Sequence, residues 1–243
     1  MVYMIASDLD YEGAKVTLDK RFPHLELGIL CDFKGYKAKH PDFECEDYII
    51  EPIKVIKNLT SKRLIKTHLP WNLLPLEIRN QTKKPKIIHI FRNPKDVIVS
   101  YYHHALLLKQ FSTSLEEYCD KFIAGNVTFA PYWDNVYSFW NRRHLPNVLF
   151  LTYEEMKRDL PKVIRKVSEF LGFANMKRNP AVAKNELLAN IDKCVARERI
   201  NGLQFIRTGK VGSYREELSS EVIKKLDEWI VEKTKDTDLK IIE

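Results

Sequence analysis

The stretch that decides the fold is Lys86–His104, KIIHIFRNPKDVIVSYYHH. It opens with a short apolar run, residues 87–91, which is typical of a buried strand, because polar residues would alternate with apolar ones if one face met water. Asn93 then fits an N-cap, Pro94 fits the first helical position, and the pattern from Val97 onward is helical. The stretch therefore predicts a strand, a sharp turn and a helix, which is half of a βαβ unit.

The turn after this strand has the chemistry of an anion site. Ligands of open parallel sheets bind beyond the carboxyl ends of the strands. Arg92 leaves the strand at that end, with a planar charged fork that suits a phosphate. Ser100 lies seven residues after Asn93, on the same helix face, where its hydroxyl would join Arg92 on one phosphate. Taken alone, the segment favours the ordinary arrangement, in which the Arg pairs with a carboxylate and the Ser points to solvent.

Length and composition set the broad class. A chain of 243 residues with 44% apolar and 30% charged residues can bury one full α/β core, and we expect a single domain over residues 1–243. The net charge of +7 favours anionic ligands, but the basic residues are spread along the chain, so we expect no nucleic-acid partner. No apolar run approaches the length of a membrane span. The four cysteines are too far apart for a metal or disulfide framework, which favours a reducing compartment: Cys31, Cys45, Cys119 and Cys194.

A second segment, Arg63–Pro70 (RLIKTHLP), carries candidate catalytic residues. Its apolar residues continue a short strand expected near residues 62–66, and Pro70 stops it. His68 then lies at the carboxyl end of the strand. A histidine titrates closest to neutral pH, so His68 is a candidate base, and Lys66 is a candidate cation for charge that develops during a reaction. The alternative for His68 alone is a residue that caps the strand and bonds the backbone.

Two further segments complete the pattern. Residues 148–151 predict another buried strand, and Tyr153 follows it at the same edge of the sheet, although a buried Tyr with a satisfied hydroxyl is a serious alternative. Residues 205–212, FIRTGKVG, form a basic glycine loop in which Arg207 supplies charge and Gly209 lets the backbone approach an anion. Basic glycine loops are common, so this loop alone would carry little weight.

Together these segments resemble the cytosolic sulfotransferases, which use 3′-phosphoadenosine 5′-phosphosulfate (PAPS). FRNPKDVIVSYYHH resembles their 3′-phosphate signature, KTHLP their catalytic segment, and the glycine loop their Arg-Lys-Gly-x-x-Gly loop, with Thr208 in place of the usual Lys. The resemblance extends from near Asp8 to about Ile230. Residues 21–26, RFPHLE, resemble a family segment near the acceptor pocket and fit a loop between helices equally well.

The resemblance implies a three-layer α/β fold with a parallel central sheet flanked by helices, like that of P-loop NTPases. It also implies transfer of a sulfuryl group from PAPS to a hydroxyl or amine of a small apolar acceptor, with His68 as base and Lys66 as charge stabiliser, and no metal. The residues that it implies for nucleotide binding are Arg92, Ser100, Tyr153, Arg207, Thr208 and Gly209.

The resemblance also carries expectations about what differs from the family. Nothing here matches the strand and 5′-phosphosulfate loop that precede the first helix in the family, so we expect an N-terminally truncated domain with impaired transfer. The family's dimerisation pattern is degraded, which favours a monomer, and a cytoplasmic location is expected. The alternative function is a non-catalytic module that binds adenosine 3′,5′-bisphosphate (PAP) or a protein.

Overall fold

The computed structural model describes residues 1–30, 32–42, 46–60, 62–107, 113–173, 199–200, 203–204 and 209–242. The chain divides into two compact units. The first unit contains Met1–Leu69 and Leu171–Lys177, and the second contains Pro70–Phe170 and Arg178–Glu243. A single domain over residues 1–243 stays a prediction. None of the helices that the structure describes is both long and apolar enough to cross a bilayer.

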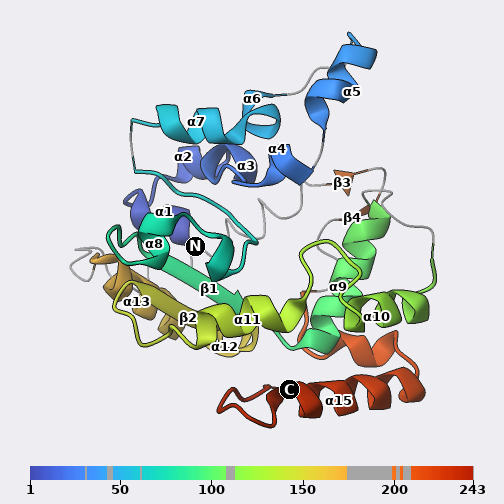
Figure 1. Ribbon diagram of the computed structural model, residues 1–243. Helices are drawn as coiled ribbons and strands as arrows, with labels where there is room; N and C mark the ends of the chain where they lie inside the picture. Colours follow the sequence, from blue (N-terminus) through green and yellow to red (C-terminus); the bar gives the residue numbers. More distant parts are fainter. Residues whose placement is uncertain are drawn as a thin grey trace. The chain divides into compact units, whose positions relative to one another are not determined.

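The first unit is built from short helices joined by turns (Figure 1). They are α1 (Val2–Ala6), α2 (Tyr11–Ala14), α3 (Leu18–Arg21), α4 (Leu27–Leu30), α5 (Phe33–Lys39), α6 (Asp47–Ile50) and α7 (Pro52–Asn58). Side chains of Asp10 and Asp32 cap α2 and α5 by accepting a hydrogen bond from a backbone N–H of the first turn. Helices this short gain little stability on their own, so contacts between them hold the unit.

The strand expected near residues 62–66 is reduced to one position in this unit. Lys66 forms a parallel bridge with His24. The backbone N–H of Leu25 donates to the carbonyl of Lys66 at 2.9 Å, and the N–H of Lys66 donates to the carbonyl of Pro23 at 3.1 Å. In the described residues, the rest of the segment has no ladder partner, so an apolar pattern alone did not make a strand there.

The second unit contains the longer elements, although the last residue of α13, Leu171, is counted with the first unit. They are η1 (Trp71–Leu73), α8 (Leu76–Arg79), β1 (Ile87–Phe91), α9 (Pro94–Leu107), α10 (Leu115–Ile123), α11 (Tyr132–Trp140), β2 (Val148–Thr152), α12 (Tyr153–Arg158), α13 (Leu160–Leu171), β3 (Arg199–Ile200), β4 (Leu203–Gln204), η2 (Ser213–Glu216) and α15 (Ser220–Thr234). β3 and β4 form a two-residue antiparallel pair. The strand–turn–helix unit over β1 and α9 is confirmed.

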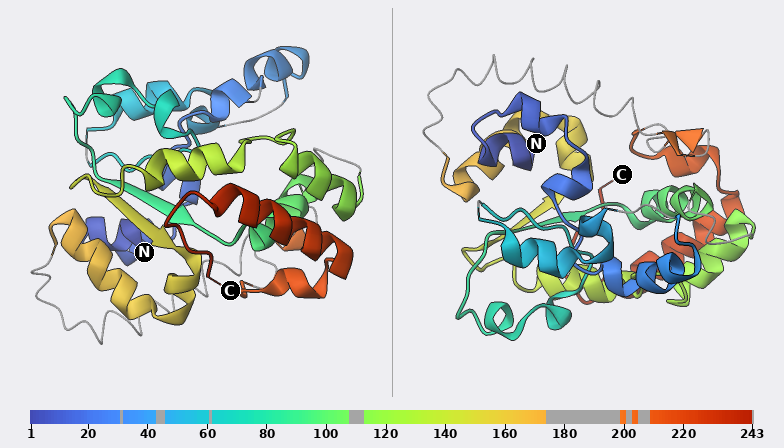
Figure 2. Two further views of the ribbon diagram at one scale, coloured as in Figure 1. Left: turned by 60° about the horizontal axis from the view of Figure 1, so that its bottom comes forward. Right: turned by 90° about the horizontal axis from the view of Figure 1, so that it is seen from above.

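β1 and β2 pair in parallel, in register from Ile87 with Val148 to Phe91 with Thr152. In Figures 1 and 2, α11 and α13 lie on opposite sides of this pair. The predicted α/β class, with parallel strands flanked by helices, is thereby confirmed. β1 is less buried than its apolar sequence predicts: Ile90 is 48% exposed. The physical reason is that β1 has β2 as its one strand neighbour in the described part of the chain.

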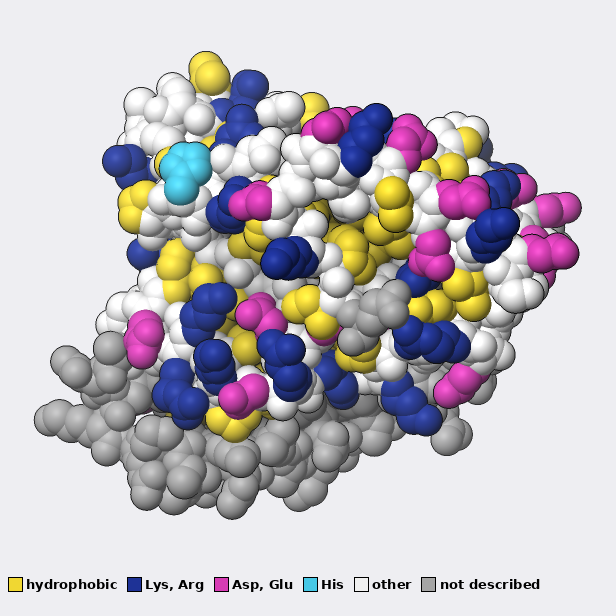
Figure 3. Space-filling view, turned by 90° about the horizontal axis from the view of Figure 1, so that it is seen from below, with side chains coloured by type: hydrophobic (Ala, Val, Ile, Leu, Met, Phe, Trp, Pro, Cys, Tyr) yellow, Lys and Arg dark blue, Asp and Glu magenta, His cyan; other side chains and the backbone are white. Residues whose placement is uncertain are grey.

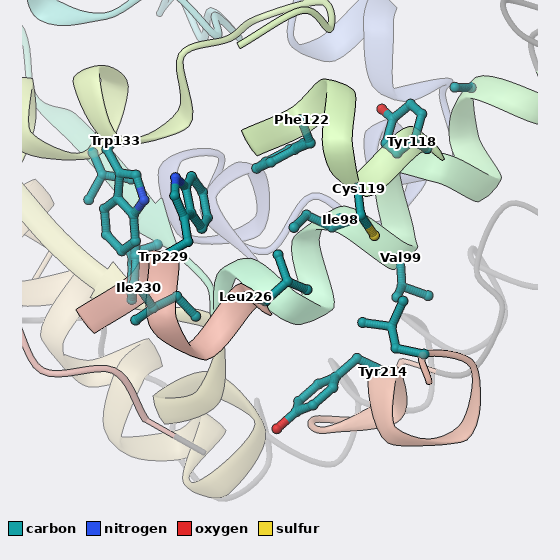
Figure 4. Close-up of a cluster of buried hydrophobic side chains, with 14 of the residues drawn as sticks. Ile98, Val99, Tyr118, Cys119, Phe122, Trp133, Tyr214, Leu226, Trp229 and Ile230 are labelled. Atoms are coloured by element: carbon teal, nitrogen blue, oxygen red, sulfur yellow. The ribbon is translucent and has the colours of Figure 1, made fainter. Parts of the chain in front are cut away.

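The core of the second unit forms where α9, α10, α11 and α15 meet (Figure 4). Three residues of α15, Leu226, Trp229 and Ile230, recur at helical spacing and are buried. The Trp229 ring lies 5.6 Å from that of Trp133 and 6.1 Å from that of Phe122, measured between centroids. Each fully buried side chain of this size stabilises the fold by roughly 1.5–3 kcal/mol. The core therefore fixes α9 and, with it, the turn between β1 and α9 that contains Arg92.

Candidate functional site

Arg92 follows β1 directly, and neighbouring elements fix the backbone of this turn. Asn93 caps α9, since its Oδ1 accepts from the backbone N–H of Lys95 at 3.0 Å. The N–H of Asn93 donates to the buried carboxylate of Glu154 at 2.8 Å. The hydroxyl of Tyr132 donates to the carbonyl of Arg92 at 2.6 Å. Because α9, α11 and α12 all contribute bonds, the turn is held in one conformation.

The side chain of Arg92 meets two other residues predicted to bind nucleotide. Its guanidinium carbon lies 4.3 Å from the centroid of the Tyr153 ring, and its Nη2 donates to the carbonyl of Lys210 at 3.2 Å. The Tyr153 hydroxyl donates to the carbonyl of Gly209 at 3.0 Å. Burial raises the pKa of Tyr153, although the nearby Arg92 opposes this, so the hydroxyl stays protonated at neutral pH. The structure thus brings together Arg92, Tyr153 and Gly209.

The Nε–H group of Arg92 has no hydrogen-bond acceptor in the described part of the chain. The Arg92 side chain is 19% exposed, and its Nε is buried. A buried N–H without an acceptor costs about 1–3 kcal/mol, and such groups in native proteins normally have a partner. An anionic oxygen is the acceptor that a guanidinium prefers. The residues present therefore fit a phosphate at this turn.

Asp96 organises the glycine segment, a role that the sequence did not predict. Its Oδ2 accepts from the backbone N–H of Gly212 at 2.8 Å, and its Oδ1 accepts from the N–H of Tyr214 at 3.2 Å and from the Ser213 hydroxyl at 3.4 Å. Oδ2 also lies 3.7 Å from Nη2 of Arg92. Gly212 has a φ of 76°, which favours glycine. One buried carboxylate thus ties residues more than 110 positions away to the start of α9.

The remaining nucleotide-binding predictions are not placed with this cluster. Ser100 lies on α9 as predicted, but it is exposed, and no hydrogen bond joins it to Arg92 in the structure. Arg207 and Thr208 lie outside the described residues. The assignment of these three residues to the nucleotide stays a prediction.

The predicted catalytic residues belong to the first unit. Pairing of Lys66 with the chain next to His24 brings His68 beside two residues of the 21–26 segment. The backbone N–H of His68 donates to Oε1 of Glu26 at 2.5 Å, and Nδ1 of His68 lies 2.9 Å from Nε2 of His24. Nε2 of His24 lies 3.0 Å from the same Oε1. His24 and Glu26 are buried, whereas the side chain of His68 is 41% exposed.

The charge state of this cluster follows from its contacts. Burial alone would raise the pKa of Glu26, but hydrogen bonds from His24 and from the side chain and backbone of His68 lower it well below its usual range. Glu26 is therefore an ionised carboxylate inside the fold. It fixes the backbone of His68, whose exposed ring can meet a ligand.

A pocket of about 490 Å³ opens elsewhere in the first unit. Its apolar lining comes from helices α4 to α7, and Leu25 joins it to the backbone that pairs with Lys66. Asp32, Glu51 and Lys54 add charge at its wall. Most of the lining residues of this pocket belong to α5, α6 and α7 or lie next to them.

Sequence reasoning missed the partners of His68 and the role of Asp96. His24 and Glu26 are 44 and 42 positions from His68 in sequence, and no local pattern predicts that separation. The available signal is the RFPHLE segment, in which a Glu follows a His by two residues. Asp96 is a carboxylate in the first turn of α9, where it suits the helix dipole. That position does not predict its contact with the glycine segment.

The second unit has paired parallel strands with helices on both sides and a basic turn at their carboxyl end, which places it in the α/β class of proteins. The family model for the sulfotransferase domain matches residues 1–238. Luciferin sulfotransferase from Photinus pyralis is 39% identical over 247 residues, which cover 94% of this chain and 65% of that protein. Amine sulfotransferase from Oryctolagus cuniculus is 33% identical over 205 residues, which cover 77% of this chain and 66% of that protein.

Solved structures agree with this match. Retinol dehydratase, in complex with androsterone and the inactive cofactor PAP, has a TM-score of 0.84 and 29% identity and covers 98% of this chain and 77% of its own. A mouse sulfotransferase complexed with PAP has a TM-score of 0.67 and 28% identity and covers 78% of this chain and 72% of its own. The chain belongs to the sulfotransferase family, as its sequence predicted. It spans slightly less than two thirds of the length of the two curated relatives above.

Proposed function

We propose that this domain transfers a sulfuryl group from PAPS to a hydroxyl or amine of a small apolar acceptor. The observation that carries the proposal is the cluster of Arg92, Tyr153 and Gly209 at the carboxyl end of β1 and β2. Its supporting context is membership of a family whose solved members include complexes with PAP.

Arg92 is the proposed anchor for the 3′-phosphate of the nucleotide. Its Nε has no acceptor in the described residues, and stacking on Tyr153 orients the guanidinium. Ser100, Arg207 and Thr208 are proposed to complete the site, with Gly209 allowing close approach of the backbone. PAPS, when bound, supplies the activated sulfuryl group.

His68 is the proposed base. An alcohol or phenol becomes a good nucleophile when its proton is accepted, and the exposed ring of His68 is held by Glu26 beneath it. The proton would leave the acceptor oxygen for the imidazole as the new O–S bond forms, while the bond between the sulfur and the 5′-phosphate oxygen of PAPS breaks and PAP leaves. Lys66, whose backbone pairs with that of His24, is proposed to offset the negative charge that develops on the transferred group.

The proposal includes a cytoplasmic, monomeric protein with a small-molecule acceptor and no nucleic-acid partner. The surface charge supports the last point. On the face shown in Figure 3, Lys and Arg side chains stand among Asp and Glu side chains. Exposed charges of the second unit are also paired, such as Lys225 with Asp120 at 2.6 Å. Basic side chains that are paired with carboxylates attract a phosphate backbone less strongly than a continuous stripe of unpaired basic side chains does.

The test combines two measurements on the protein. Calorimetry with PAP measures nucleotide binding, and transfer of radiolabelled sulfuryl from PAPS is assayed over phenols, alcohols and amines. Arg92→Ala should weaken PAP at least about tenfold, because it removes a charge-assisted contact to phosphate. The matched control, Arg79→Ala, removes an exposed Arg at the end of α8 and should leave affinity unchanged.

His68→Ala separates binding from catalysis. It should lower transfer at least about a hundredfold while PAP affinity stays within twofold of the unmodified protein. PAP binding without transfer to any acceptor would contradict the enzyme proposal and support a non-catalytic nucleotide-binding module. Equal PAP affinity in Arg92→Ala and Arg79→Ala would overturn the assignment of the phosphate site.

A further inference from the structure

Three potential ligand atoms converge inside the first unit, on the buried side of His68. Nε2 of His24 lies 2.9 Å from Nδ1 of His68 and 3.0 Å from Oε1 of Glu26, and Nδ1 of His68 lies 3.3 Å from the same Oε1. The two imidazole rings meet edge to face, with centroids 4.8 Å apart. Each of the three side chains can offer an electron pair to a cation.

Protons cannot satisfy all three contacts at once. If His24 alone carries a proton on Nε2, the lone pairs of His68 Nδ1 and Glu26 Oε1 face each other. If His68 alone carries a proton on Nδ1, the lone pairs of His24 Nε2 and Glu26 Oε1 face each other. If both nitrogens are protonated, two N–H groups point together across 2.9 Å. Every placement leaves one short contact unfavourable, which is costly where His24 and Glu26 are buried.

One cation satisfies all three groups. We propose that His24, Glu26 and His68 form a binding site for a first-row divalent transition metal, with Zn²⁺ as the ion that fits best. Zinc bonds of about 2.0–2.1 Å place tetrahedral ligands roughly 3.3 Å apart, close to the observed separations. Two imidazoles and a carboxylate are a ligand set that zinc accepts, and its fourth position stays open.

A second observation supports an ion at this place. The other carboxylate oxygen of Glu26, Oε2, is buried and accepts no hydrogen bond of ordinary geometry among the described residues, although the nearby Thr67 hydroxyl also lowers the pKa of this carboxyl. The side chain of Glu26 is only 4% exposed, so water does not replace the missing partner from bulk solvent. A metal would use this second oxygen or neutralise the buried charge that it carries. His68, which is 41% exposed, provides the entry path.

The ion has a consequence for transfer, which rests on the proposed function. A neutral imidazole that gives its Nδ1 electron pair to a metal carries its proton on Nε2. Nε2 of His68 can then no longer accept a proton from the acceptor hydroxyl. Zinc should therefore inhibit transfer, and a chelator should restore it.

The binding test needs no enzyme activity. Untagged protein, treated with chelator and dialysed, is titrated with Zn²⁺ by calorimetry and with Co²⁺ by visible absorption, which reports coordination geometry. We expect one equivalent of either ion and a tetrahedral Co²⁺ spectrum. His24→Phe keeps an aromatic ring beside His68 and should weaken Zn²⁺ at least about tenfold. The matched control, His144→Phe, changes an exposed histidine outside the cluster and should bind like the unmodified protein.

Folding is checked by circular dichroism, and Glu26→Gln gives a second variant that keeps the side-chain shape. Zn²⁺ should raise the melting temperature of the unmodified protein and of His144→Phe, but not of His24→Phe or Glu26→Gln. No saturable Zn²⁺ binding, or equal affinity in His24→Phe, would overturn the site. Zinc binding in a protein that transfers no sulfuryl group would support the site and contradict only the proposed function. Undiminished transfer at saturating Zn²⁺ would overturn the inhibition.

Discussion

The Arg92 cluster and the His68 cluster are built in different ways. Arg92 follows a strand and precedes a helix of 14 residues, and both elements are packed in a core of aromatic side chains. His68 follows a single β bridge, in a unit whose described helices have four to seven residues. Regular elements position the first cluster, whereas side-chain contacts across distant segments position the second.

This difference determines what a substitution should do in each unit. In the second unit, removal of a buried polar partner leaves backbone groups unpaired inside a packed structure, so stability should fall steeply. In the first unit, many contacts are exposed, so single changes should cost less. All four tryptophans lie in the second unit, at Trp71, Trp133, Trp140 and Trp229. Tryptophan fluorescence therefore follows that unit, while far-ultraviolet circular dichroism follows the helices of both.

The largest effect is expected for Asp96→Ala. The change leaves the N–H groups of Gly212 and Tyr214 without their acceptor and removes the carboxylate beside Arg92. Breaking a buried charged partner of this kind costs about 3–5 kcal/mol. Urea unfolding followed by tryptophan fluorescence should show a lower midpoint at an unchanged slope, which corresponds to a loss of that size in the free energy of unfolding.

Asp236→Ala is the matched control, because Asp236 is an exposed carboxylate just beyond α15. It should change the free energy of unfolding by less than about 0.5 kcal/mol. A loss below about 1 kcal/mol in Asp96→Ala would show that the glycine segment does not depend on this carboxylate, and the contrast between the two units would weaken.

A smaller effect, which depends on pH, is expected at His89 on β1. Burial lowers the pKa of His89 to about 4, and its ring stacks on Phe139 with centroids 4.5 Å apart. Between pH 6.5 and pH 4 the unfolded chain binds a proton that the folded chain does not, so stability falls as the pH falls through this window. The loss reaches at most roughly 3 kcal/mol.

His89→Phe keeps the stacked ring and removes the titrating nitrogen, whose Nε2 is buried without a partner in the described residues. The variant should therefore match or exceed the stability of the unmodified protein at pH 7 and exceed it by more at pH 4. Urea titrations at both pH values measure the difference. His144→Phe, at an exposed position, should show no such gain. An identical pH dependence in His89→Phe and the unmodified protein would contradict the assignment of a neutral buried imidazole.

Local signals predicted much of the second unit. The apolar run before Arg92 and the cap at Asn93 indicate β1 and the start of α9, and Ser114 caps α10 by accepting from the N–H of Glu117. Gly172 ends α13 with a φ of 82°. These features depend on neighbours within a few residues, so a local sequence pattern is enough to predict where such strands and helices begin and end.

The rest depends on contacts that no local pattern encodes. The strand expected near residues 62–66 needed a partner ladder, and the described residues supply one only at Lys66. The meeting of His24 and Glu26 with His68 depends on that same pairing, and the contact of Asp96 with the glycine segment spans 116 to 118 positions. Residue types alone therefore indicated His68 and Arg92 as candidate site residues but not the side chains that hold them.

The smallest effect is expected in the first unit, for Lys62→Met. Nζ of Lys62 donates to the carbonyl of Ala6, at the end of α1, at 2.9 Å and lies 4.5 Å from the centroid of the Phe173 ring. Methionine keeps the apolar stem and loses both contacts, so the free energy of unfolding should fall by about 0.5–1 kcal/mol. Lys57→Met, at an exposed position of α7, is the matched control.

The readout of Lys62→Met tests whether the two units unfold as one. If they do, the transitions seen by circular dichroism and by tryptophan fluorescence should shift together. If the first unit unfolds separately, only the circular dichroism transition should shift, because the tryptophans all lie in the other unit. A shift in fluorescence alone would contradict both expectations, since Lys62, Ala6 and Phe173 all belong to the first unit. Separate unfolding would mean that the His68 cluster can be lost while the Arg92 cluster, and with it the proposed nucleotide site, persists.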